Sequence, residues 1–105
     1  MPLASHIVQV FLPLNRRDGT PQSTAEFQAV RQDMLERCGG VTVYARAPAE
    51  GLWKGDDRIE ADRIVIFEAM DDRFDQGWWA SYRTALQERF DQDEILIRAV
   101  AAVRI

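Results

Sequence analysis

The sequence has few of the side chains that small proteins use for disulfides, metal binding or covalent catalysis. Its 105 residues include one cysteine, Cys38, and one histidine, His6. A single cysteine excludes an internal disulfide and any zinc site that needs several cysteines. With one residue of each type, neither a histidine-rich metal centre nor a Cys–His nucleophile pair has support. We therefore expect no metal and no other cofactor.

Basic charge is also scarce, and this scarcity excludes two classes of partner. Thirteen Lys and Arg stand against seventeen Asp and Glu, for a formal net charge of −4, and Lys54 is the only lysine. Proteins that bind nucleic acid normally present a basic face to the phosphates, and no such stripe can be found here. The acidic balance also argues against an anionic membrane surface. We expect neither nucleic acid nor membrane as a partner.

Long apolar runs are missing as well. No segment approaches the roughly 20 apolar residues that a helix needs to cross a bilayer. The start, Met-Pro-Leu-Ala-Ser-His, lacks the basic and apolar regions of a signal peptide. Together these features predict a cytoplasmic protein. The length suits a single domain over residues 1–105, and 47% hydrophobic residues are enough for a real core.

The spacing of the apolar residues predicts four strands and two helices. Alternation predicts strands over 6–14, 41–46, 63–70 and 95–105, and Pro13 should end the ladder of the first. Residues 48–62, rich in Gly, Pro and acids, are predicted to be a long hairpin connection around Trp53. The element order is then β-α-β-β-α-β, a ferredoxin-like α+β arrangement. Right-handed crossovers place both helices on one face of a four-stranded antiparallel sheet.

The helix boundaries have recognisable signals. Ser23 followed by Glu26 is a capping box, and Gly39-Gly40 should end the helix that it opens. The second helix follows an aspartate cap, either in Asp71-Asp72 or at Asp75. Its buried stripe is Trp79, Tyr82, Leu86 and Phe90.

The sheet face away from the helices is predicted to be mostly apolar. Such a contiguous surface is too large to leave in water, and packing two sheets face to face would bury it in a homodimer of the α+β barrel type. In the alternative, the 48–62 connection folds back and covers the face. The expected residues of this face are Ile7, Phe11, Tyr44, Ile64, Ile66, Leu96 and Val100.

Polar residues on this face are the candidate site. Gln9, Arg46, Glu68 and Arg98 would be costly to bury unless they are paired. In one interpretation, Arg46 and Arg98 hold a small organic ligand, anionic or carbonyl-bearing, in a cleft between sheet and helices. In the other, an arginine pairs with Glu68 across the strands and only sets their register.

The remaining candidate residues surround this site or supply its chemistry. Tyr44 would line its wall, and Trp53 and Trp78 would lie at its rim. If the protein is an enzyme, which the residues alone do not decide, Glu68 or His6 would move the proton in a cofactor-free oxidation or isomerisation. The non-catalytic alternative is that the apolar face serves self-association alone.

One further enzymatic alternative involves Pro2. The chain is similar to tautomerases in having a proline after the first Met on a β-α-β scaffold, and that resemblance implies an N-terminal amine as the base. In tautomerases the proline opens the first strand directly. Here residues 3–5 are expected to separate Pro2 from the strand.

Four short motifs spread over most of the chain resemble the landmarks of a bacterial domain family. That family is ferredoxin-like and has no assigned activity, so the resemblance implies no catalytic residues. In fold the chain is also similar to the dimeric α+β barrel superfamily, which includes cofactor-free monooxygenases, haem-degrading enzymes and isomerases. It lacks the helix histidine of the haem-degrading pattern and resembles the cofactor-free oxygenases through a Trp, an Arg and Asn15. The motifs are Arg17-Asp18-Gly19, Gly40-Val41-Thr42-Val43, Gly51-Leu52-Trp53 and Arg89-Phe90-Asp91-Gln92.

Overall fold

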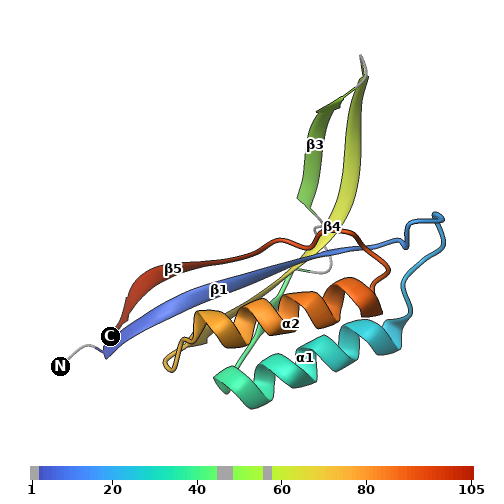
Figure 1. Cartoon of the computed structure of the whole chain (residues 1–105). Helices are drawn as coiled ribbons and strands as arrows, with labels where there is room; N and C mark the ends of the chain where they lie inside the picture. Colours follow the sequence, from blue (N-terminus) through green and yellow to red (C-terminus); the bar gives the residue numbers. More distant parts are fainter. Residues whose placement is uncertain (1–2, 45–48, 56–57) are drawn as a thin grey trace.

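Two helices lie against one face of an antiparallel sheet (Figure 1). The computed structural model describes the backbone of residues 3–44, 49–55 and 58–105, and the side chains of residues 4–44 and 64–105. The elements in chain order are β1 (Leu3–Pro13), α1 (Thr24–Cys38), β2 (Thr42–Val43), β3 (Ala49–Gly55), β4 (Arg58–Asp71), α2 (Gln76–Arg89) and β5 (Ile97–Arg104).

The main sheet has the strand order β2-β4-β1-β5, with all neighbours antiparallel, and this confirms the predicted ferredoxin-like α+β fold. β1 lies at the centre, where Val8 pairs with Ala69 of β4 and with Ala99 of β5. The ladder between β1 and β4 ends at Pro13, which lacks the N–H needed to continue it. β5 is an edge strand of this order.

The predicted four strands are joined by a fifth, β3, which pairs with the first half of β4. β4 therefore begins at Arg58 instead of at 63, and the expected connection is a two-stranded arm. Figure 1 shows the arm projecting from the sheet on the side away from the helices. The alternative that this segment lies flat over the sheet is wrong. Glycine and acidic residues in 49–63 hid the strand pattern, because both are depleted in strands.

Three other strand boundaries also differ from the prediction. β2 is only Thr42–Val43, although the backbone N–H of Tyr44 still donates to the carbonyl of Ile66. β5 begins at Ile97, two residues later than expected. β1 begins at Leu3, so the expected spacer between Pro2 and the strand does not exist; Pro2 itself lies outside the described residues.

The helix caps follow the sequence signals. The Ser23 hydroxyl accepts from the N–H of Glu26, and Gly39 ends α1 with a left-handed φ of 82°. Of the two alternatives for α2, Asp75 is the cap, and its carboxylate accepts from the N–H of Trp78. Asp71 lies at the end of β4 instead and has another role, described below.

The core lies between the helices and one face of the sheet. β1 and β4 contribute alternate residues to it, and the predicted stripe of α2 is buried against them. Its fully buried large side chains include Val8, Val10, Leu12, Val30, Met34, Phe67, Leu86 and Phe90. The opposite face of the sheet, which we call the open face, carries the apolar residues predicted for it. Tyr44, Leu96 and Val100 are 42%, 55% and 56% exposed there.

Candidate functional site

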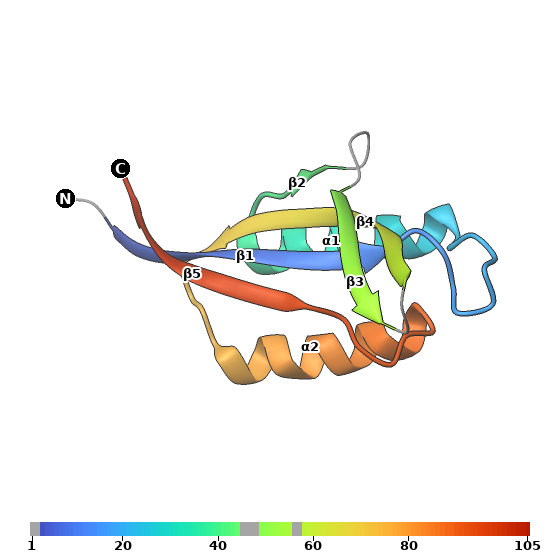
Figure 2. The same ribbon diagram turned by 90° about the horizontal axis from the view of Figure 1, so that it is seen from above.

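A groove of about 440 Å³ runs between α2 and the strands β1 and β5. α2 lies alongside β5, the edge strand, so the groove opens at the side of the molecule (Figure 2). Phe74, Trp79 and Arg83 line it from α2 and the segment before it, and His6 and Ala99 line it from the sheet. Its walls thus combine aromatic rings, an imidazole and a guanidinium.

His6 is placed in this groove by strand alternation. It shares the helix-facing side of β1 with Val8 and Val10, and it pairs with Ala101 of β5. Its ring stacks on Phe74, with ring centroids 4.2 Å apart and planes 18° apart. The stacking orients the half-buried imidazole at the groove, where it can donate or accept a hydrogen bond.

The open face carries a row of hydrogen-bonded polar side chains that crosses the sheet. Arg98 Nε of β5 donates to Gln9 Oε1 at 2.7 Å, and Gln9 Nε2 of β1 donates to Glu68 Oε1 of β4 at 2.8 Å. The Tyr44 hydroxyl, just beyond β2, donates to Glu68 Oε2 at 3.2 Å. We call these four residues the polar row. Of the predicted site it brings together Tyr44, Glu68 and Arg98, while Arg98 and His6 both line the groove.

The polar row fits neither sequence interpretation fully. Gln9 stands between Arg98 and Glu68, so these two are bridged by an amide in place of a direct ion pair, and the alternative pairing of Arg46 with Glu68 lies outside the described residues. The Arg98 guanidinium also lies 5.0 Å from the Phe11 ring centroid. The negative Glu68 carboxylate raises the pKa of the Tyr44 phenol, and this keeps the phenol a donor to that carboxylate. The row faces away from the helices, whereas the groove lies on the helix side of the sheet, so of the row's four residues Arg98 alone borders the groove.

The other predicted site residues are dispersed. Trp78 lies on α2 outside both the groove and the polar row, stacked on Tyr82 at 5.2 Å with the Arg37 guanidinium 4.7 Å from its ring centroid. Arg46 and the side chain of Trp53 lie outside the described residues. Arg98 borders the groove as well as the open face, because β5 is the edge strand between them.

Sequence reasoning missed the role of Asp71, the most buried carboxylate among the described side chains. Asp71 is 1% exposed and accepts from the Trp79 indole at 2.8 Å, from the backbone N–H of Arg73 at 2.9 Å and from Arg37 Nε at 3.3 Å. These contacts tie β4 to both helices. The sequence signal for this role is that Asp71 continues the helix-facing alternation of Phe67 and Ala69, so that a charged residue stands at a core position. With both oxygens occupied, Asp71 is a structural acceptor.

Cys38 and the acidic residues with described side chains show no second site. Burial raises the pKa of the Cys38 thiol to about 11, so it is a poor nucleophile at neutral pH. Within residues 4–44 and 64–105, no group of three or more His, Cys, Asp or Glu is placed to hold a metal ion. No helix in the described part is both long and apolar enough to span a membrane.

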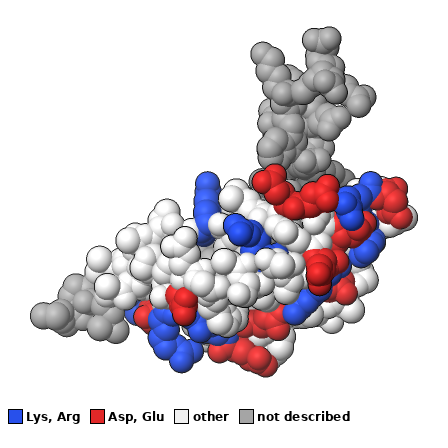
Figure 3. Space-filling view, in the orientation of Figure 1, with Lys and Arg blue, Asp and Glu red and all other residues white. Residues whose placement is uncertain are grey.

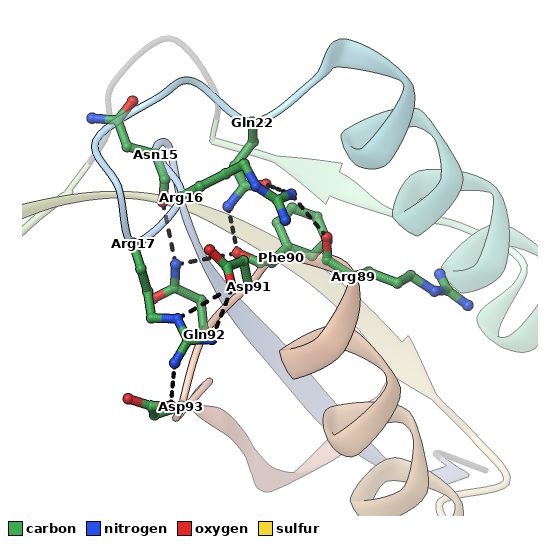
Figure 4. Close-up of polar contacts among 9 residues, drawn as sticks. All are labelled: Asn15, Arg16, Arg17, Gln22, Arg89, Phe90, Asp91, Gln92 and Asp93. Atoms are coloured by element: carbon green, nitrogen blue, oxygen red, sulfur yellow. Dashed lines mark hydrogen bonds and ion pairs between the residues drawn. The ribbon is translucent and has the colours of Figure 1, made fainter.

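Two of the motifs that carry the family resemblance meet at one end of the molecule (Figure 4). Arg17 NH2 lies 2.9 Å from Asp91 Oδ1, and Arg17 NH1 lies 2.6 Å from Asp93 Oδ1. Gln22 Nε2 donates to the carbonyl of Phe90 at 2.6 Å. These contacts hold the loop before α1 against the turn after α2. These two motifs therefore have a structural explanation that needs no ligand.

Comparison with known proteins identifies the fold and no family. No protein-family model and no curated protein matches the chain, so membership of the bacterial domain family stays a prediction. The chain is similar in structure to a phage SAM lyase solved in complex with S-methyl-5'-thioadenosine, with a TM-score of 0.64 and 11% sequence identity. The match covers 94% of this chain and 88% of that one. At this identity the likeness supports the ferredoxin-like α+β fold alone.

Proposed function

We propose that the protein binds a small organic ligand in the groove between α2 and β5, and that it does so as a homodimer. The groove itself is the observation that carries the ligand proposal. Its volume of about 440 Å³ falls within the range of roughly 300–1,000 Å³ typical of small-molecule sites. The phage SAM lyase supports it, because a protein of this fold was solved in complex with a small organic ligand, S-methyl-5'-thioadenosine.

The walls of the groove favour a ligand with a flat ring and an anionic or carbonyl group. Phe74 and Trp79 offer apolar aromatic surface to such a ring. Arg83 presents a guanidinium, which suits a carboxylate or phosphate, and His6 adds a second polar contact from the facing strand. The groove therefore offers aromatic surface to a ring and a polar group on each of its two walls.

If the protein is an enzyme, His6 is better placed than Glu68 to move a proton. Both Glu68 oxygens already accept hydrogen bonds, one from Gln9 and one from Tyr44. His6 borders the groove, where a bound molecule would lie within reach. The proposed chemistry is then a cofactor-free isomerisation or oxidation, with binding as the property to test first.

The homodimer follows from the open face, which exposes Tyr44, Leu96 and Val100. Pairing through this face leaves the groove free, because the groove lies on the helix side of the sheet. Each copy would thus keep its own ligand site.

A residue-specific NMR titration tests the ligand proposal. S-methyl-5'-thioadenosine and phenylacetate serve as probes, since the two share an aromatic ring and differ in charge. We expect saturable amide shifts at His6, Ala80 and Ala101, and weaker phenylacetate binding in Arg83→Gln. Arg31→Gln, which alters an exposed arginine on α1, is the matched control.

Three results would decide against the proposal. Equal shifts in Arg83→Gln and in the wild type would show that the Arg83 guanidinium does not contact the ligand. Shifts confined to the open face would place the ligand elsewhere. Binding of neither probe at millimolar concentration would favour the non-catalytic alternative, in which the fold serves self-association alone.

A further inference from the structure

We infer that two copies pack open face to open face with their polar rows antiparallel, so that Arg98 of each copy approaches the Glu68–Tyr44 end of the other. This inference rests on the proposed homodimer and deepens it, because it specifies the orientation. It also assigns the polar row a role that neither a ligand cleft nor a register pair explains.

The row is set within an apolar surface. On one side of it Phe11 pairs with Ile66, and on the other Ile7 pairs with both Met70 and Val100. Leu96 extends the first of these flanks, where it is more than half exposed. In Figure 3 uncharged surface extends toward the chain termini, with basic side chains near the middle of the molecule and most other charged side chains over the helices and the loop end. A polar row across such an apolar surface is typical of an interface that specifies its partner's orientation. A second charged contact, of Asp72 with Ser5 and Arg104, lies nearer the chain termini.

The row has a positive and a negative end. Arg98 on the β5 edge provides the cation, and Glu68 provides the anion nearer to β2, with neutral Gln9 between them. Among the described side chains, Arg98 and Glu68 are each bonded to the neutral amide of Gln9. A polar line of this kind is neutral overall and has a direction across the sheet.

Twofold symmetry leaves two simple ways to stack such a line on its copy. A twofold axis parallel to the row places identical residues opposite each other, so that Arg98 faces Arg98 and Glu68 faces Glu68. An axis along the strands reverses the row, so that Arg98 of each copy faces the acidic end of the other. Like charges facing each other in a closed interface are destabilising, and opposite charges are complementary. The charges thus select the reversed arrangement.

Burial strengthens this selection. Arg98 is exposed in one copy, with a neutral acceptor and the Phe11 ring as its contacts. When a second sheet covers it, the guanidinium loses water and needs a carboxylate. Glu68 supplies that carboxylate in the polar row, whereas Asp72, just beyond the end of β4, already accepts from Ser5 and Arg104. The second copy therefore provides a carboxylate for Arg98 and a guanidinium for Glu68 in each row.

The β3–β4 arm is consistent with a second copy on this face. Its backbone projects from the sheet on the open-face side, at the end of the sheet away from the chain termini (Figure 1). Among the described residues β3 pairs with β4 alone, so the arm forms no second layer with the rest of its own chain. A copy seated on the sheet would lie beside it.

Sedimentation equilibrium tests the surface and the orientation together. Val100→Asp adds a charge at an exposed position, so it should abolish the wild-type dimer without unfolding the monomer. Arg98→Gln should weaken the dimer by at least about tenfold, because each dimer loses two complementary pairs. Arg83→Gln, the same change on the helix side, should leave the dimer unchanged. Circular dichroism of each variant checks that the fold is retained.

The outcomes separate the inference from the proposed function. A dimer that Arg98→Gln leaves unchanged or tightens would overturn the antiparallel orientation and keep the homodimer. A dimer that survives Val100→Asp would show that another surface pairs the copies, and it would overturn the inference. A wild-type protein that stays monomeric at about 100 µM would overturn both.

A cross-link measures the orientation directly. In a Cys38→Ala background, Thr42→Cys places one thiol at the β2 end of each row. With stacked sheets about 10 Å apart and strands about 4.8 Å apart, the two Cα atoms at position 42 are about 22 Å apart when Arg98 lies over the partner copy's Glu68, and about 10 Å apart in the parallel arrangement. We expect a long bismaleimide to link the copies and a short one to fail. Efficient linking by the short reagent would contradict the inference.

Discussion

Replacing Asp71 with alanine should be among the most destabilising single changes in the described part of the chain. Three donors converge on this carboxylate, from Trp79, Arg73 and Arg37, and it is 1% exposed. Breaking a buried pair by removing one partner costs about 3–5 kcal/mol. Arg37 keeps its bond to the carbonyl of Arg73, so we expect the lower end of that range, about 3 kcal/mol.

The assay is thermal unfolding followed by circular dichroism. At about 4 °C per kcal/mol for a domain of this length, the midpoint should fall by about 12 °C. Asp72→Ala is the matched control, because the neighbouring carboxylate is 46% exposed and bonds Ser5 and Arg104 at the surface. A loss in Asp71→Ala no larger than the loss in Asp72→Ala would refute the structural role assigned to the buried carboxylate.

Two further predictions concern titration. Cys38 should react with iodoacetamide at a rate that rises up to about pH 11, because burial raises the pKa of its thiol from 9.0 to about 11. Mass spectrometry would report the rate, and a midpoint near pH 9.0 would contradict the burial. Arg17→Gln should raise the pKa of Asp91, which the Arg17 guanidinium now lowers, and carboxyl NMR would detect the change. A lowered folded-state pKa stabilises the protein above the unfolded value of about 3.8, and this contribution is lost as the pH falls through the folded-state pKa. An unchanged Asp91 pKa in Arg17→Gln would show that the contact does not persist in solution.

Periodicity predicted the main sheet and both helices because each element buries one face. The alternation of Val8, Val10 and Leu12 decided which side of β1 the helices cover, and burial confirms it. Capping signals were equally local, since Ser23 and Gly39 act within one helical turn. Such features depend on neighbours in the chain and can be predicted without the tertiary structure.

The candidate site was harder to predict because it depends on which elements are adjacent. Gln9 looked like one polar residue among several, and only the register of β1 with β4 and β5 shows that it bridges Glu68 and Arg98. The groove was not predictable from the spacing of its residues, since His6 and Phe74 meet through the docking of α2 beside the sheet. The β3–β4 arm was missed because its composition disfavours strands.

Amide NMR of the uniformly labelled protein, at two protein concentrations and with and without phenylacetate, tests the separation of the two surfaces most directly. The account predicts that dilution shifts open-face amides such as Phe11 and Val100, whereas the probe shifts groove amides such as His6 and Ala101. Probe-induced shifts centred on the open face, or dilution shifts centred on the groove, would contradict it.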